Sequence, residues 1–242
     1  MNEIKLKRYQ KDFEYSYTFG TYPTIDLLKY HSDKVIKILL KKDGFGSEGV
    51  DEVIQLCEEK GIKYEINDWV IDKIAYKENT YALGAFKKYD SEINPVSNHV
   101  VLAQPRNMGN LGTIIRTMLG FGYKDLAIIK PAADIFDPTI VRSAMGALFS
   151  INFEYFDSLE DYYKIFSDRK SYLFMLDGAT KLDDVVFENP HTLVFGNEGS
   201  GLPTESKKFG TPVYIEHSKE IDSLNLSIAV GIALHKASKN SK

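Results

Sequence analysis

HVVLAQPRNMGNLGTIIRTMLG, at residues 99–120, contains a strand, a loop and a helix in one run. His99 to Ala103 is an apolar segment of strand length. Polar and glycine residues follow, and apolar residues with helical spacing then continue from Gly109 to Gly120. Strand, loop and helix in this order indicate one repeating unit of an α/β sheet.

The alternation of strand and helix continues toward the carboxyl end of the chain. Such alternation predicts a mostly parallel sheet covered on both faces, with ligands bound beyond the carboxyl ends of its strands. Strands are expected at residues 126–129, 152–156, 171–176, 192–195 and 212–215, and helices at 138–148, 159–166 and 226–238.

The amino-terminal part of the sequence predicts a second, smaller α/β unit. Its expected elements are a strand at 35–40, a helix at 49–60 and a strand at 62–66. A polar segment rich in turn-forming residues follows at 90–98. We therefore expect two domains, residues 1–92 and 93–242.

Composition limits the function classes that fit this chain. Cys57 is the only cysteine, so the sequence offers no disulfide framework and no thiol cluster for zinc, and a reducing cytoplasm is expected. No apolar run approaches the roughly 20 residues that a membrane span needs. The five histidines form no H-x-x-x-H pair, so no metal site is expected. The net charge of -4 does not favour nucleic-acid binding, although a local basic patch could provide it.

Three loops at expected strand ends combine glycine with polar residues. The first, at 104–112, leads into a helix that carries Arg116, and Asn107 or Asn110 could cap that helix. The second, at 195–203, has three glycines within six residues and includes Glu198. The third, at 221–227, alternates polar with apolar residues. Each loop alone could equally be a capped helix start or a glycine-rich surface turn.

Together and in this order, the three loops resemble the sequence motifs of the SpoU (TrmH-like) family of RNA 2′-O-ribose methyltransferases, in the SPOUT superfamily. The resemblance covers about residues 99–238. Its motifs are NMGNLGTIIRT at 107–117, GNEGSGL at 196–202 and SLNLS at 223–227, and RSAMGA at 142–147 resembles the family's connecting helix.

The resemblance implies a knotted catalytic domain, a cofactor and a set of site residues. The fold would be an α/β domain with a trefoil knot, and the protein would be a homodimer that binds S-adenosylmethionine. The catalytic residues implied are Asn110, Arg116, Glu198, Ser223 and Asn225. The cofactor contacts implied are Leu176, Asp177, Gly178, Phe195, Gly196, Asn197, Gly199, Ile215, Ser223 and Leu224.

The first domain resembles, more weakly, the ribosomal-protein-like substrate-binding domain of many SpoU enzymes. The resemblance lies in GTYPTIDLL at 20–28, whereas NTYALG at 79–84 departs from the His-Gln-Gly segment common in relatives. It implies ribosomal RNA in preference to transfer RNA as the substrate. The aromatic residues Tyr15, Tyr17, Phe19 and Tyr22 could stack on bases, but we interpret them as packing residues.

Two other functions fit part of the sequence. GFGSEG at 44–49 matches G-x-G-x-x-G between a strand and a helix, as in dinucleotide-binding domains, with Glu65 near the expected acidic position. A non-catalytic RNA-binding protein of the same fold is the second alternative. A hydrolase is excluded by spacing, since no G-x-S-x-G and no P-loop occurs.

Arg116 invites a particular chemical hypothesis. A guanidinium is a very weak acid and rarely gives up its proton, so it is a poor general base. We expect Arg116 to hold a phosphate and to stabilise a developing 2′-oxyanion, with the proton lost to solvent or phosphate.

Overall fold

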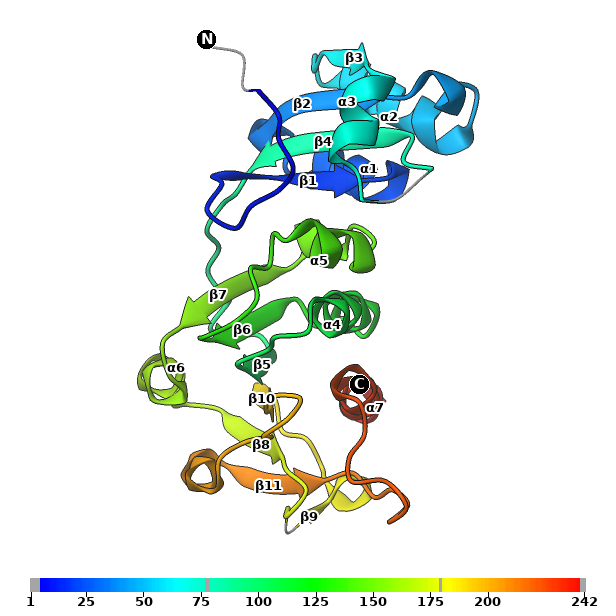
Figure 1. The fold of residues 1–242 in the computed structure, drawn as a ribbon. Helices are drawn as coiled ribbons and strands as arrows, with labels where there is room; N and C mark the ends of the chain where they lie inside the picture. Colours follow the sequence, from blue (N-terminus) through cyan, green and yellow to red (C-terminus); the bar gives the residue numbers. More distant parts are fainter. Residues whose placement is uncertain (1–4, 77–78, 179, 240–242) are drawn as a thin grey trace. The chain divides into compact units, whose positions relative to one another are not determined.

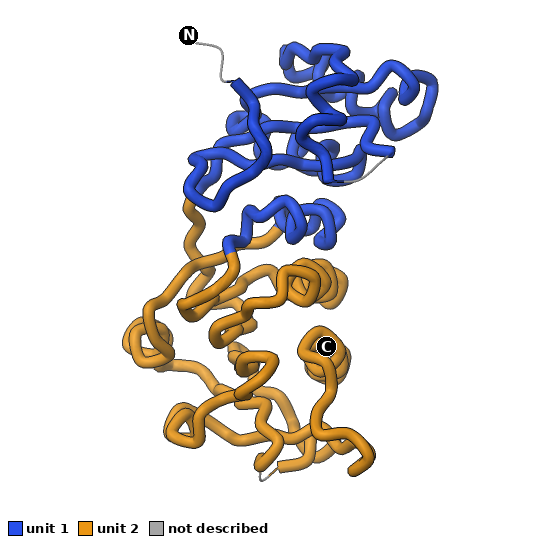
Figure 2. Tube along the Cα trace, in the orientation of Figure 1, with its two compact units in different colours: residues 1–89, 134–150 blue, residues 90–133, 151–242 orange. Residues whose placement is uncertain are grey.

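The computed structural model describes residues 5–76, 79–178 and 180–239, which form two compact units. Figure 2 shows unit 1, residues 1–89 and 134–150, and unit 2, residues 90–133 and 151–242. Unit 1 therefore includes a segment, 134–150, that lies within the expected second domain. The roles expected for residues 1–92 and 93–242 stay predictions.

Unit 2 is built on a seven-stranded sheet in which every pairing is parallel, as predicted. The strand order is β7-β6-β5-β10-β8-β11-β9, so a strand late in the chain, β10, lies between β5 and β8. The strands are β5 (His99–Ala103), β6 (Asp125–Ile129), β7 (Asn152–Phe156), β8 (Lys170–Phe174), β9 (Thr180–Lys181), β10 (His191–Phe195) and β11 (Thr211–Tyr214).

Helices cover both faces of this sheet. In Figure 1, α4 (Met108–Gly120) and α7 (Leu226–Lys239) lie on one side of it and α6 (Leu159–Ile165) lies on the other. Strands β5, β6 and β10 are buried along their whole lengths, which explains why they read as continuous apolar runs and not as alternating ones.

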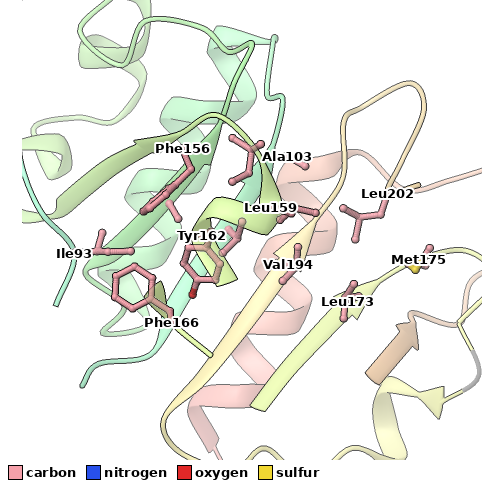
Figure 3. Close-up of a cluster of buried hydrophobic side chains, with 13 residues drawn as sticks. Ile93, Ala103, Phe156, Leu159, Tyr162, Phe166, Leu173, Met175, Val194 and Leu202 are labelled. Carbon is pink, nitrogen blue, oxygen red and sulfur yellow. The ribbon is translucent and has the colours of Figure 1, made fainter. Parts of the chain in front are cut away.

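The face under α6 contains one hydrophobic cluster, shown in Figure 3. Leu159 and Tyr162 of α6, with Phe166 just beyond it, pack onto strand residues that include Phe156 and Val194. Each fully buried side chain of this size contributes roughly 1.5–3 kcal/mol to the hydrophobic driving force. This packing of α6 on the strands therefore stabilises the sheet beneath the loops at its carboxyl edge.

The amino edge of the sheet holds two fully buried histidines in closed hydrogen-bond networks. His99 Nε2 lies 2.8 Å from the Asn94 carbonyl and Nδ1 lies 2.8 Å from the Tyr162 hydroxyl. His191 Nδ1 lies 3.2 Å from the Glu188 carbonyl and Nε2 lies 2.7 Å from the Tyr123 hydroxyl. Each ring therefore donates to a carbonyl and accepts from a tyrosine, an arrangement that suits neutral imidazole.

Unit 1 contains a four-stranded mixed sheet in the order β1-β4-β2-β3. Helices α1 and α2 share a hydrophobic cluster with one set of its residues, and α3 shares a second cluster with another set. Tyr17 and Phe19 are buried in the second cluster, as the packing interpretation predicted, whereas Tyr22 is exposed. The elements are β1 (Tyr15–Phe19), α1 (Thr21–Tyr30), β2 (Val35–Leu40), α2 (Glu48–Glu59), β3 (Tyr64–Ile66), α3 (Asp68–Ile74) and β4 (Ala82–Lys87).

The helix expected at 138–148 is wrong beyond its first half. Helix α5 (Pro138–Ser143) ends early, because Met145 and Gly146 have φ of 52° and 90°, and a 3₁₀ turn follows at Ala147–Ser150. A side chain at Gly146 would collide with the Asp26 carboxylate of α1. Close packing within unit 1 has overridden local helix preference.

The described helices show no candidate for a membrane span, since none is both long enough and apolar enough to cross a bilayer.

Candidate functional site

Four neighbouring strands end at the part of the sheet where the site residues gather. β5, β10, β8 and β11 are consecutive in the sheet, and the loops that follow them contain all three sequence motifs or lead into them. Since all four strands run parallel, their loops emerge at the same edge. The fold therefore brings together segments that are about 100 residues apart in sequence.

The first loop reaches α4 through an unusual backbone conformation. Gln104 has φ of 54°, a left-handed value that is costly for a residue with a side chain. Asn107 then caps α4, its Oδ1 accepting a hydrogen bond from the Asn110 backbone N at 3.0 Å. Asn110 therefore lies in the first turn of the helix, and its side-chain amide is left for other partners.

The second loop doubles back on itself at Gly196. A Cβ at Gly196 would lie 2.1 Å from the backbone carbon of Gly201, so only glycine fits. Asn197 closes the turn, since its Oδ1 accepts from Gly199 N at 2.9 Å. Its Nδ2 donates to the Gln104 carbonyl at 2.8 Å, so Asn197 fastens the second loop to the strained residue of the first.

Glu198 organises the first loop around its carboxylate. Oε1 accepts from the backbone N of Asn107 at 3.1 Å and from Asn110 Nδ2 at 3.5 Å. Oε2 accepts from the backbone N of Arg106 and from Asn197 Nδ2, both at 3.4 Å. Four donors around one carboxylate hold the Glu198 side chain in place and tie it to the first loop.

The third loop joins the same cluster through Asn225. Its Oδ1 accepts from Ser227 N at 2.9 Å, which caps α7, and its Nδ2 donates to Asn110 Oδ1 at 3.2 Å. Asn110 thus donates to Glu198 and accepts from Asn225. The side-chain amide of Asn110 therefore connects all three loops, and its two bonds fix the orientation of the amide.

The other two residues expected to be catalytic are not bonded into this cluster. Arg116 is exposed on α4, and within the described residues its guanidinium has no hydrogen-bond or ion-pair partner. It lies six residues after Asn110, about 9 Å along the helix axis. Ser223 is exposed in the third loop. Both side chains are therefore accessible to a ligand.

The residues expected to contact a cofactor lie on the loops after β8, β10 and β11. A side chain at Gly178 would collide with the backbone of Val213, so the loop after β8 packs closely against β11. Phe195 is buried and stacks on Phe174, the last residue of β8, with ring centroids 4.4 Å apart. Leu176 is 68% exposed, and Ile215 and Leu224 are partly exposed, which leaves an apolar rim around glycine backbone.

Lys207 is a neighbour of the site that lies outside the three sequence motifs. Its Nζ lies 2.6 Å from Asp177 Oδ2 and holds the pKa of that carboxyl below its usual value. This ion pair ties the 176–178 loop to the segment at 204–209. Nothing in the local sequence pairs residues 30 positions apart, so only the fold could reveal it.

The dinucleotide-binding alternative does not fit the structure around its glycines. Gly46 N donates to the Asp51 carboxylate at 3.3 Å, and Glu48 is in the first turn of α2. A side chain at Gly49 would meet Thr21 of α1, so this glycine serves helix packing. Acidic groups at a helix start repel a pyrophosphate. The described residues also contain no group of three side chains suited to a metal ion.

A parallel α/β sheet with three motif-bearing loops joined at its carboxyl edge defines the class of protein, a ligand-binding α/β domain. Residues 97–235, more than half of the chain, match the model of the SpoU rRNA Methylase family. The chain belongs to this family, whose members are S-adenosylmethionine-dependent RNA 2′-O-methyltransferases. The resemblance seen in the sequence is confirmed.

Individual relatives agree with the family assignment. An uncharacterised tRNA/rRNA methyltransferase of Synechocystis is 30% identical over 57% of this chain, and the match spans about half, 52%, of that protein. The 23S rRNA (guanosine-2′-O-)-methyltransferase of Acinetobacter baylyi is 22% identical over 91% of this chain and 96% of its own length. The AdoMet-bound rRNA methyltransferase of Sinorhizobium meliloti superposes with a TM-score of 0.81 at 27% identity, covering 95% of this chain and 88% of its own.

Proposed function

We propose that this chain transfers a methyl group from S-adenosylmethionine to a ribose 2′-hydroxyl of RNA, with ribosomal RNA as the substrate. The observation that carries the proposal is the bonding of Asn110 to both Glu198 and Asn225, which joins all three motif loops into one polar cluster. The cluster lies at the carboxyl edge of the sheet, where α/β domains bind ligands.

The loops after β8, β10 and β11 fit the cofactor. Bound there, it would supply an electrophilic methyl group on a sulfonium. Backbone of 176–178, 195–197 and Gly199 would hold its polar groups, and the apolar rim of Leu176, Ile215 and Leu224 would cover the rest. Backbone approaches closely because Gly178 and Gly196 carry no side chain.

Arg116 would stabilise charge on the attacking oxygen. Its guanidinium is accessible and stays protonated, so it can bind a phosphate of the RNA and the developing 2′-oxyanion. The proton of the hydroxyl leaves to solvent or to that phosphate. Ser223, exposed on the third loop, would orient the ribose.

Glu198, Asn110 and Asn225 would keep the reacting groups in line. Attack on the methyl group needs a fixed geometry, and a well-positioned pair of reactants gains on the order of 7–11 kcal/mol from proximity. These three side chains hold together the loops that would bind the ribose and the cofactor, and do so through bonds already formed in the free protein.

The length of the alignment with the Acinetobacter relative favours ribosomal RNA as the substrate. That protein, named for 23S rRNA, aligns over 91% of the chain and thus includes unit 1, the expected RNA-binding part. The Synechocystis relative, named for tRNA or rRNA, aligns over only 57%. A homodimer and a cytoplasmic location belong to the same proposal, by family resemblance.

Incubation with methyl-labelled S-adenosylmethionine and separated ribosomal and transfer RNA tests the proposal. Label is expected in ribosomal RNA as a 2′-O-methyl nucleoside. Label in transfer RNA alone would correct the substrate, and RNA binding without transfer would favour a non-catalytic RNA-binding protein. Sedimentation at micromolar concentration would test the dimer.

A further inference from the structure

Two aromatic rings lie exposed on the α3 side of unit 1. Trp69, the only tryptophan in the chain, is 69% exposed, and Tyr76, just after α3, is 54% exposed. Tryptophan is usually well buried, so such exposure suggests a ligand. Ala75 between α3 and Tyr76 is extended, so Tyr76 lies just outside the helix. The charge of Arg8 acts on Tyr76, and the Arg8 side chain bonds to the carbonyl of Lys73, so Tyr76 lies near the same end of α3 as Lys73.

Cations accompany these rings. Lys73 Nζ lies 4.7 Å from the centroid of the Trp69 ring, a cation–π contact between neighbouring turns of α3. The Arg8 side chain donates from Nε to the Lys73 carbonyl at 3.0 Å, which brings the amino-terminal segment onto α3. We name Arg8, Trp69, Lys73 and Tyr76 the α3 patch.

The carboxylates around the α3 patch are engaged with other groups. Asp68 accepts from the backbone N of Lys42, and Asp72 is ion-paired with Lys41. Burial raises the pKa of the Tyr76 hydroxyl, the charge of Asp137 adds to this, and Arg8 opposes it. Asp137 in turn caps α5. The positive groups of the patch are therefore not simply cancelled by neighbouring acids.

We propose that the α3 patch binds an unpaired segment of the RNA substrate, with bases stacked on Trp69 and Tyr76 and phosphates held by Arg8 and Lys73. This inference rests on the proposed RNA substrate and adds a second contact to it, on unit 1. Aromatic rings interleaved with cations suit single strands, because the faces of unpaired bases are accessible. In a duplex those faces are stacked on neighbouring bases.

The single tryptophan makes the patch directly observable. Titration of the full protein with a single-stranded RNA oligonucleotide should quench the fluorescence of Trp69 in a saturable way that weakens with added salt. The same sequence as a duplex should quench much less. No quenching by the single strand, or equal quenching by both forms, would overturn the proposal.

Variants separate stacking from general binding. Trp69→Ala should weaken binding of labelled single-stranded RNA roughly tenfold, and Trp69→Phe should restore most of it. Tyr30→Ala is the matched control, since Tyr30 is 57% exposed on unit 1 but at the far end of α1, and it should bind as the wild type does. Unchanged binding by Trp69→Ala would contradict the proposal.

Binding and methyl transfer are measured apart, so the two proposals fail differently. If no RNA accepts label but Trp69 is quenched by single strands, the proposed activity fails and the α3 patch stands. If label is transferred equally well by wild type and Trp69→Ala at low RNA concentration, with no quenching, the α3 patch fails and the activity stands.

Discussion

The two edges of the seven-stranded sheet use polar residues in opposite ways. At the amino edge, His99 and His191 are fully buried and both ring nitrogens of each have partners. At the carboxyl edge, Glu198 and Asn225 are partly or fully exposed, and Gln104 has a left-handed backbone. Saturated buried networks stabilise a fold, whereas organised but accessible groups bind a ligand. Position in the sheet therefore separates structural histidines from the side chains that we propose to be functional.

Acid should destabilise the protein at the amino edge of the sheet, and this loss of unfolding free energy is the largest effect we expect. Burial lowers the pKa of His99 and of His191 to about 4, against 6.5 for an ordinary histidine. The unfolded chain binds more protons between these values, so stability falls as the pH drops through that range. The loss should reach about 2 kcal/mol per histidine by pH 5.

Urea unfolding followed by circular dichroism at pH 7, 6 and 5 checks this prediction, with ring-proton NMR to assign each pKa. A constant denaturant slope serves as the control for an unchanged unfolding reaction. A free energy of unfolding that is flat from pH 7 to 5 would contradict the buried network.

Arg116→Ala should break the chemistry at the carboxyl edge without disturbing the fold. Methyl transfer should fall at least roughly 100-fold, the usual loss of a transition-state charge stabiliser, while S-adenosylmethionine binding is retained. Single-turnover transfer and calorimetry measure the two quantities. Lys130→Ala, which removes an exposed cation paired with Asp157, is the control. Undiminished methyl transfer by Arg116→Ala would contradict a role of Arg116 in the reaction.

Glu198→Gln should loosen the first loop. All four partners of the carboxylate are donors, so an amide nitrogen would face at least one of them. We expect roughly tenfold slower transfer with little change in the unfolding temperature. Glu205→Gln, exposed outside the motifs, should have no effect. Methyl transfer at the wild-type rate by Glu198→Gln would show that the hydrogen bonds of the Glu198 carboxylate are dispensable.

Lys207→Ala should give the smallest effect. Loss of the exposed pair with Asp177 should weaken S-adenosylmethionine binding about two- to fivefold, and less so at high salt. Calorimetry at two salt concentrations measures this. Lys208→Ala is the matched control, because its partner is Glu160 on α6, away from the predicted cofactor loops. Equal affinities of the two variants for S-adenosylmethionine would contradict a role of the 176–178 loop in cofactor binding.

Much of the fold follows from local patterns, and the exceptions have physical causes. β2, β5 and β7 have the predicted bounds because their apolar runs are short and clearly delimited. β1 was missed, since its Ser16 and Thr18 are buried despite being polar. A knot depends on the path of the whole chain, so no periodicity predicts it and only the family resemblance implied one.

The three loops of the site could be predicted, but the bonds among them could not. Asn107 was one of the two caps that the sequence predicted for α4, and it could be proposed because capping is local. The bonds from Asn110 to Glu198 and Asn225 join residues 88 and 115 positions apart, and the ion pair of Lys207 with Asp177 joins residues 30 positions apart. Sequence patterns predict candidate site residues, while the order of strands in the sheet decides which of them meet.

Mapping of 2′-O-methyl groups in RNA from cells with the intact protein, with Arg116→Ala and without the protein tests the central claim most directly. The account predicts a mark in ribosomal RNA that is present only with the intact protein. Identical marks in all three RNA samples would contradict the assignment of methyl transfer to the carboxyl edge of this sheet.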